Sequence, residues 1–113
     1  ADSLAKLLRS CPAVRDLDVF STGLRPAALR RLAVGLQEEG VAQLQLHSLN
    51  LVGNGDLLAE KAGVDALRMF LNLCPELAEM KLGDNAVWGG RRQERREEVC
   101  HYLRGLVPGV AIS

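Results

Sequence analysis

The chain has little of what marks a specialised class of protein. Its aromatic content is 4%, and its formal net charge is zero, from fourteen Lys plus Arg against fourteen Asp plus Glu. Zero net charge argues against nucleic acid and anionic membranes as partners, because both normally require a basic excess. No apolar run approaches the roughly 18 residues of a membrane span, and no charged-then-apolar leader opens the chain. These absences favour a soluble domain with another kind of partner.

Cysteine is also scarce. Cys11, Cys74 and Cys100 are far apart and odd in number. A disulfide framework needs pairs, and a structural zinc site usually has two ligands two to four residues apart. Neither pattern is present. We therefore predict buried, reduced thiols in a cytoplasmic protein, with no metal and no cofactor.

What the chain does contain is aliphatic residues. Hydrophobic residues make up 48% and charged residues 25% of its 113 positions, which is the composition of a globular domain. Roughly one residue in five is leucine, about double the usual share of the commonest residue. This length predicts a single domain over 1–113, too short for two cores.

A pattern of the form apolar-x-x-apolar-x-apolar occurs four times, at 14–19, 41–46, 77–82 and 107–112. The four copies follow one another at broadly similar intervals, of which the one from the second copy to the third is the longest. Each copy predicts a short strand, because alternate residues of a strand face the same side.

Helical apolar spacing fills the intervals between these copies and precedes the first. It predicts helices over 2–10, 26–36, 64–74 and 91–106. The junction before a strand also occurs twice, as Cys11-Pro12 and Cys74-Pro75. Strands that alternate with helices predict an α/β fold with a parallel sheet.

At this point the chain resembles the leucine-rich repeat family. Its pattern L-x-x-L-x-L-x-x-N-x-L is matched best by Leu77-Ala78-Glu79-Met80-Lys81-Leu82-Gly83-Asp84-Asn85-Ala86-Val87. The period resembles the ribonuclease-inhibitor-like subtype, and the Cys-Pro junctions are similar to those of F-box leucine-rich repeats. The resemblance implies a right-handed strand–helix solenoid of about four short strands. It also implies protein recognition on the concave strand face.

The sequence departs from that family pattern in two places. The family's asparagine is kept only at Asn85, while Thr22 and Leu49 occupy the aligned positions of the first two copies. The second copy is also longer than the others, with the excess at 52–60. We expect a loop insertion there, and solenoid insertions often carry function.

Strand alternation divides the predicted strands into inward and outward residues. The inward residues should be Leu17, Val19, Leu44, Leu46, Met80 and Leu82. The predicted partner-binding residues are the outward Asp16, Asp18, Phe20, Gln43, Gln45, His47, Glu79 and Lys81, joined by Asp84 and Trp88 after the third strand. We expect Asp18, Gln45 and Lys81 to form one lateral row, and Phe20, His47 and Gly83 another.

Other motifs are weaker. Gly53-Asn54-Gly55-Asp56 lacks the lysine and hydroxyl of a phosphate loop and is typical of a turn. The run 91–98 interleaves Arg with Glu, which favours a solvated helix face. No Ser, His and Asp arrangement completes a catalytic triad.

The sequence therefore predicts a protein–protein interaction module with no catalysis of its own, expected to be part of a larger protein. Two alternatives stay open. One is a structural segment docked in a larger assembly, such as a cytoskeletal, ubiquitin-ligase or NLR-type receptor scaffold. The other is a small α/β ligand-binding domain.

Overall fold

The computed structural model describes residues 2–11, 13–19, 23–41, 43–54, 57–58, 61–82 and 92–112, with the backbone alone described at 2–3 and 92–96. Helices and strands alternate along these residues, as predicted. The elements are α1 (Asp2–Ser10), β1 (Asp16–Asp18), α2 (Pro26–Glu38), β2 (Ser48–Asn50), α3 (Lys61–Leu71), β3 (Glu79–Lys81), α4 (Arg92–Leu106) and β4 (Ala111–Ile112).

The strands form one parallel sheet in the order β1-β2-β3-β4. Equivalent residues Asp16, Ser48, Glu79 and Ala111 lie side by side across it, and these positions are almost equally spaced along the chain. Each crossover between neighbouring strands contains a helix, as parallel pairing requires a long connection. The predicted α/β class with a small parallel sheet is confirmed.

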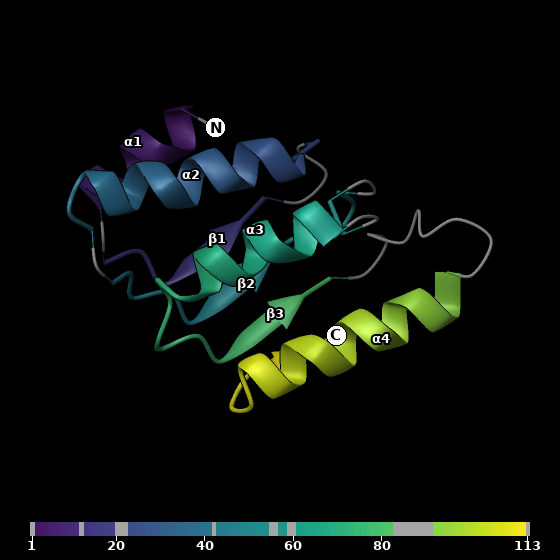
Figure 1. Ribbon diagram of the computed structural model, residues 1–113. Coiled ribbons are helices and arrows are strands. Elements are labelled where there is room, and N and C mark those ends of the chain that lie inside the picture. The colour runs from purple at the N-terminus through teal and green to yellow at the C-terminus, as the bar shows by residue number, and fades with distance from the viewer. Residues whose placement is uncertain are drawn as a thin grey trace.

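The helices form a single layer that runs from α1 to α4 in chain order, with the sheet behind it (Figure 1). Each helix packs against the next one, and α2 and α3 share the largest interface. The core lies between this layer and the sheet, and the predicted inward residues are buried there. They are Leu17, Val19, Leu44, Leu46, Met80 and Leu82.

Helix α2 shows why these residues form helices where they do. Pro26 occupies the first turn, where its missing N–H costs nothing. Leu29, Leu32 and Leu36 then form the buried stripe. Just after the helix, Gly40 has a φ of +84°, a left-handed conformation that favours glycine. Its N–H donates to the carbonyl oxygen of Gln37, which closes the last turn.

The helix-to-strand junctions at the two cysteines are built alike, as predicted. After α1, the N–H of Val14 donates to the Cys11 carbonyl oxygen at 3.2 Å. After α3, the N–H of Leu77 donates to the Cys74 carbonyl oxygen at 3.3 Å. Both turns carry the chain from the helical layer into a strand.

The predicted second strand is wrong. The described residues of 41–46 form no strand, and β2 begins at Ser48 instead. Both 41–46 and 46–51 satisfy the same apolar pattern, so the pattern alone does not distinguish them. The expected insertion at 52–60 is therefore also wrong, since the strands are almost equally spaced. The fourth copy shifts in the same way, because the register that pairs Ile112 with Met80 aligns Gly109, not Val107, with Leu77.

The corrected register explains why the polar residue Asn54 is buried. In the copy that starts at Leu46, Asn54 occupies the position that Asn85 holds in the third copy. Its Oδ1 accepts a bond from the Leu24 N–H at 2.9 Å. Its Nδ2 donates to the carbonyl oxygens of Val19 at 2.9 Å and Leu51 at 3.0 Å. Asn54 thus connects the ends of β1 and β2.

Of the turn predicted at 53–56, Gly53 lies in a turn together with Val52, while Gly55 and Asp56 lie outside the described residues. Gly53 has a φ of +80°, which a residue with a side chain rarely adopts. This backbone conformation brings Asn54 back under the end of β2.

Close packing also requires a glycine at one position of α3. A Cβ at Gly63 would lie 1.4 Å from the carbonyl oxygen of Leu57. Only glycine lets the helix approach that backbone without a shift. The segment before α3 is therefore packed against the helix through its own main chain.

Candidate functional site

The face of the sheet opposite the helices is the candidate site. Within β1 and β3 the central residue is buried and its two neighbours are exposed. In β2 the central Leu49 is buried and its neighbours are half-buried. Parallel sheets are usually covered on both faces. On this face the described residues of β1, β2 and β3 are all polar, and those of β1 and β3 are exposed.

The register arranges these side chains in two lateral rows. The first row is Asp16, Ser48, Glu79 and Ala111, and in it Oγ of Ser48 donates to Oε1 of Glu79 at 2.9 Å. The second row is Asp18, Asn50 and Lys81. Neighbouring strands lie about 4.8 Å apart, so a partner's extended segment or helix could contact one residue of each strand.

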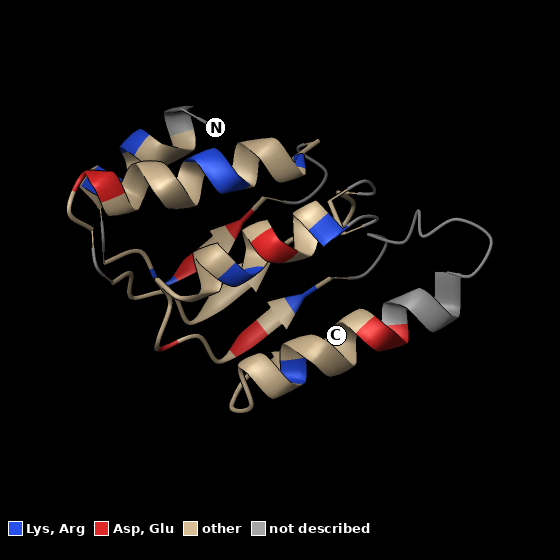
Figure 2. Cartoon of the chain, viewed as in Figure 1, with Lys and Arg blue, Asp and Glu red and all other residues tan. Residues whose placement is uncertain are grey.

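Charge is unevenly distributed over the two rows, which are called the open sheet face below. In Figure 2, β1 is acidic at both ends, and β3 begins with an acidic and ends with a basic residue. β2 contributes only the neutral Ser48 and Asn50. Local charge therefore exists on a chain whose net charge is zero.

The structure confirms the outward placement of Asp16, Asp18, Glu79 and Lys81, which are exposed on this face. The predicted row of Asp18, Gln45 and Lys81 is wrong, because Asn50 lies between the other two. Gln43 and Gln45 are exposed but lie before β2 and outside the sheet.

His47 is also misplaced by the predicted register. It is half-buried, and its backbone bonds to Arg15 on one side and to Ala78 and Glu79 on the other. The predicted row of Phe20, His47 and Gly83 is therefore replaced by Arg15, His47 and Ala78. Phe20, Gly83, Asp84 and Trp88 lie outside the described residues.

Sequence reasoning missed Ser48 and Asn50, the central residues of the open sheet face. A signal for them was present. Reading the pattern from Leu46 gives Leu46-His47-Ser48-Leu49-Asn50-Leu51-Val52-Gly53-Asn54, which includes the asparagine that the 41–46 alignment lacks.

The cysteines offer little chemistry. Cys74 is buried, its thiol donates to the Phe70 carbonyl oxygen, and burial raises the pKa of this thiol to about 12. Cys11 is exposed and Cys100 is half-buried, so the prediction of buried thiols is wrong for Cys11. Within the described ranges, no three His, Cys, Asp or Glu side chains are grouped as metal ligands. None of the helices described is long and apolar enough to cross a membrane.

Comparisons of the chain with protein-family models, with curated proteins and with solved structures give no match. The arrangement of the open sheet face is thus what bears on function.

Proposed function

We propose that this chain is a short leucine-rich-repeat-type solenoid that binds another protein through its open sheet face and carries no catalysis of its own. The observation that carries the proposal is the parallel sheet with helices on one side and exposed polar residues on the other. A sheet face of this kind offers side chains to a partner without any rearrangement of the backbone.

The repeat spacing supports the solenoid part of the proposal. Units of nearly equal length each place one strand beside the last, and each interior row contains one inward residue per strand. Short units of this kind bury their apolar faces only by stacking. The bonds of Asn54 to Val19 and Leu24 resemble the role of the family's asparagine in tying neighbouring turns together.

Charge complementarity would then select the partner. Asp16 and Asp18 favour a basic group over β1, and Lys81 favours an acidic group over the end of β3. Ser48 and Asn50 between them offer hydrogen bonds with less cost of desolvation than a charge.

A charge-reversal pair tests this proposal. Asp18→Arg combined with Lys81→Glu keeps the net charge at zero and reverses the polarity of one row. Both residues are exposed, so we expect stability to change by less than about 0.5 kcal/mol. Affinity capture followed by mass spectrometry should lose the proteins that bind the unaltered chain.

The matched control is Arg31→Glu combined with Glu38→Arg, which makes the same change of charges on exposed residues of α2. This variant should retain the captured proteins. Retention of the same proteins by the sheet-face variant would exclude the open sheet face as the binding surface.

A further inference from the structure

The stack of strand–helix units has two flanks, neither of which belongs to the open sheet face. β1 and β4 are the edge strands of the sheet, and α1 and α4 lie at opposite ends of the helical layer (Figure 1). Among the described residues, no helix or strand lies beyond α1 or beyond α4 in this order. The side formed by α1 and β1 is called the head flank below, and the side formed by α4 and β4 the tail flank.

Leu7 is an exposed apolar side chain on the head flank. Nη1 of Arg9 forms an ion pair with Oε1 of Glu39, just after α2, at 3.1 Å, so this side of α1 faces α2. Residues two apart lie about 200° apart around a helix, which places Leu7 on the opposite side. Leu7 is 48% exposed, more than any other large hydrophobic side chain in the described part of the chain.

The third unit shows what covers the position of Leu7 inside the stack. The register aligns β1 with β3, through β2, at a shift of 63 residues, and the same shift relates Leu7 to Phe70. Phe70 is 1% exposed, and it lines a small interior cavity together with Leu29 and Leu32 of α2. In the interior, the preceding strand–helix unit therefore helps to bury this position.

Two further positions of the head flank repeat this contrast. Cys11 is exposed, whereas its counterpart Cys74 is buried. Val14 is half-buried, whereas its counterpart Leu77 is buried. The head flank thus exposes to solvent the kind of surface that an adjacent strand–helix unit covers elsewhere in the chain.

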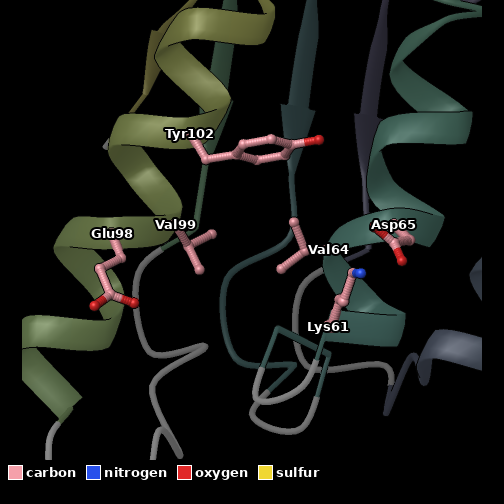
Figure 3. A pocket seen from close by; sticks show the side chains of 6 residues that line it. All are labelled: Lys61, Val64, Asp65, Glu98, Val99 and Tyr102. Atoms are coloured by element: carbon pink, nitrogen blue, oxygen red, sulfur yellow. The ribbon is translucent and has the colours of Figure 1, made fainter.

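The tail flank presents the opposite side of such a unit. Val99 and Tyr102 of α4 point towards α3 (Figure 3), so Cys100, two residues before Tyr102, lies on the far side of the helix. Cys100 is half-buried. In the edge strand, Ile112 is also half-buried, whereas Met80 beside it in β3 is 0% exposed. A small side chain on the helix and an aliphatic one in the strand leave this flank partly apolar.

We propose that the tail flank of one copy of this chain docks on the head flank of a second copy. This contact would continue the parallel strand pairing and the side-by-side helix packing that the chain already forms internally. The continued register places Ala111 of one copy beside Asp16 of the next, and α4 over Leu7. A contact between two head flanks would instead join two β1 strands that are acidic at both ends, and like charges on adjacent strands are destabilising.

Sedimentation velocity of the whole chain over a range of concentrations tests the proposal. A head-to-tail contact does not close on itself, so the average mass should rise with concentration beyond that of a dimer. Leu7→Glu should weaken association at least about tenfold, because it places a charge in an apolar contact. Ala27→Glu is the matched control, since it makes the same change of charge at an exposed position of α2, and it should associate as the unaltered chain does.

Three outcomes of this experiment would overturn the proposal. They are an unaltered chain that stays monomeric at every concentration, undiminished association of Leu7→Glu, and a mass that saturates at the dimer. The first would leave the head flank to a different protein, and the last would assign it to a symmetric pair of copies.

Mixing two blocked variants tests whether the contact joins unlike flanks. The Ala111 N–H donates to the Ala78 carbonyl oxygen in β3, so the N–H of the next residue, Ile112, points to the outer edge. Ile112→Pro removes that donor, and proline is tolerated at such an edge position. Leu7→Glu and Ile112→Pro should each be monomeric alone, and their equimolar mixture should form a complex of twice the monomer mass. Failure to form this complex from two folded variants would exclude the head-to-tail contact.

Ala111 tests the register with both signs and does not depend on the folding of Ile112→Pro. Ala111 is exposed on β4, and the proposed contact places it beside the carboxylate of Asp16 in the next copy. Ala111→Lys should therefore strengthen association about threefold, and Ala111→Asp should weaken it about threefold. Equal effects of the two substitutions would contradict the proposed register.

Discussion

The two faces of the sheet differ although one backbone builds both. The inner row of Leu17, Leu49 and Met80 is buried against the helices. The outer row of Asp18, Asn50 and Lys81 is displaced from it by a single residue in each strand. The inner row stabilises the fold by burying apolar surface, and the outer row supplies polar and charged groups to the surface. Substitutions one residue apart should therefore have effects of different kinds, and the first of the three tests below compares two such residues.

The largest effect is expected at Met80. Met80→Ala removes a side chain that is 0% exposed and should lower the free energy of unfolding by about 2–5 kcal/mol, because the cavity left behind cannot collapse fully. The next residue is the control, since Lys81→Ala on the outer face should change stability by less than about 0.5 kcal/mol. Urea denaturation measures both, and similar losses for the two variants would contradict the division between faces.

A smaller loss of stability is expected for Asn54→Ala, because Asn54 connects the C-terminal ends of β1 and β2. Asn54→Ala removes three hydrogen bonds, one from the Leu24 N–H and two to the carbonyls of Val19 and Leu51, and a typical hydrogen bond contributes about 0.5–1.5 kcal/mol. Water entering the site would reduce the total, so we expect a loss of about 2 kcal/mol.

Asn50 is the matched control for Asn54. Its Oδ1 accepts one local bond, from the N–H of Val52 at 3.0 Å, and the residue is only half-buried. Asn50→Ala should cost about 0.5–1 kcal/mol by urea denaturation. A larger loss at Asn50 than at Asn54 would show that the connection through Asn54 contributes little.

The smallest effect concerns the ionisation of Cys74, which changes the stability of the fold only above neutral pH. Burial raises the pKa of its thiol from 9.0 to about 12. The unfolded chain releases this proton near pH 9 while the folded chain retains it, so stability falls as the pH rises between these two values. The loss at pH 10 should be about 1.4 kcal/mol.

Stability curves of the unaltered chain and of Cys74→Ala measure this loss as the difference in their alkaline slopes. Cys11→Ala is the control, because Cys11 is exposed, and its alkaline slope should match that of the unaltered chain. Parallel curves for the unaltered chain and Cys74→Ala between pH 8 and 10 would contradict the assignment.

Much of the fold could be predicted from the sequence because helices carry a redundant signal. The stripe of Leu29, Leu32 and Leu36 repeats over several turns, so one ambiguous residue does not change the interpretation. The strands, by contrast, are very short. A strand of that length contains one inward residue, which is too little pattern to establish its own position.

The shortness of the strands affected the prediction of the candidate site most. Asp16, Asp18, Glu79 and Lys81 were found because their strands were placed correctly, whereas Ser48 and Asn50 were missed together when the second strand was placed at 41–46. A register error moves every side chain of the strand at once. A hollow lined by residues of both α3 and α4, among them Val64 and Val99 (Figure 3), could not have been found in this way, because these residues are far apart in the chain.

By itself, the sequence determined the alternation of strand and helix, the identity of the inward leucines and the absence of any framework of disulfides. These properties depend on local periodicity and composition, which a short stretch of the sequence already shows. Only the tertiary structure decided which of two equivalent apolar patterns became β2, that Asn54 would bond to the previous unit, and which charges would share a face. Those choices depend on backbone bonds between segments that lie far apart in the sequence, and only the folded chain brings such segments together.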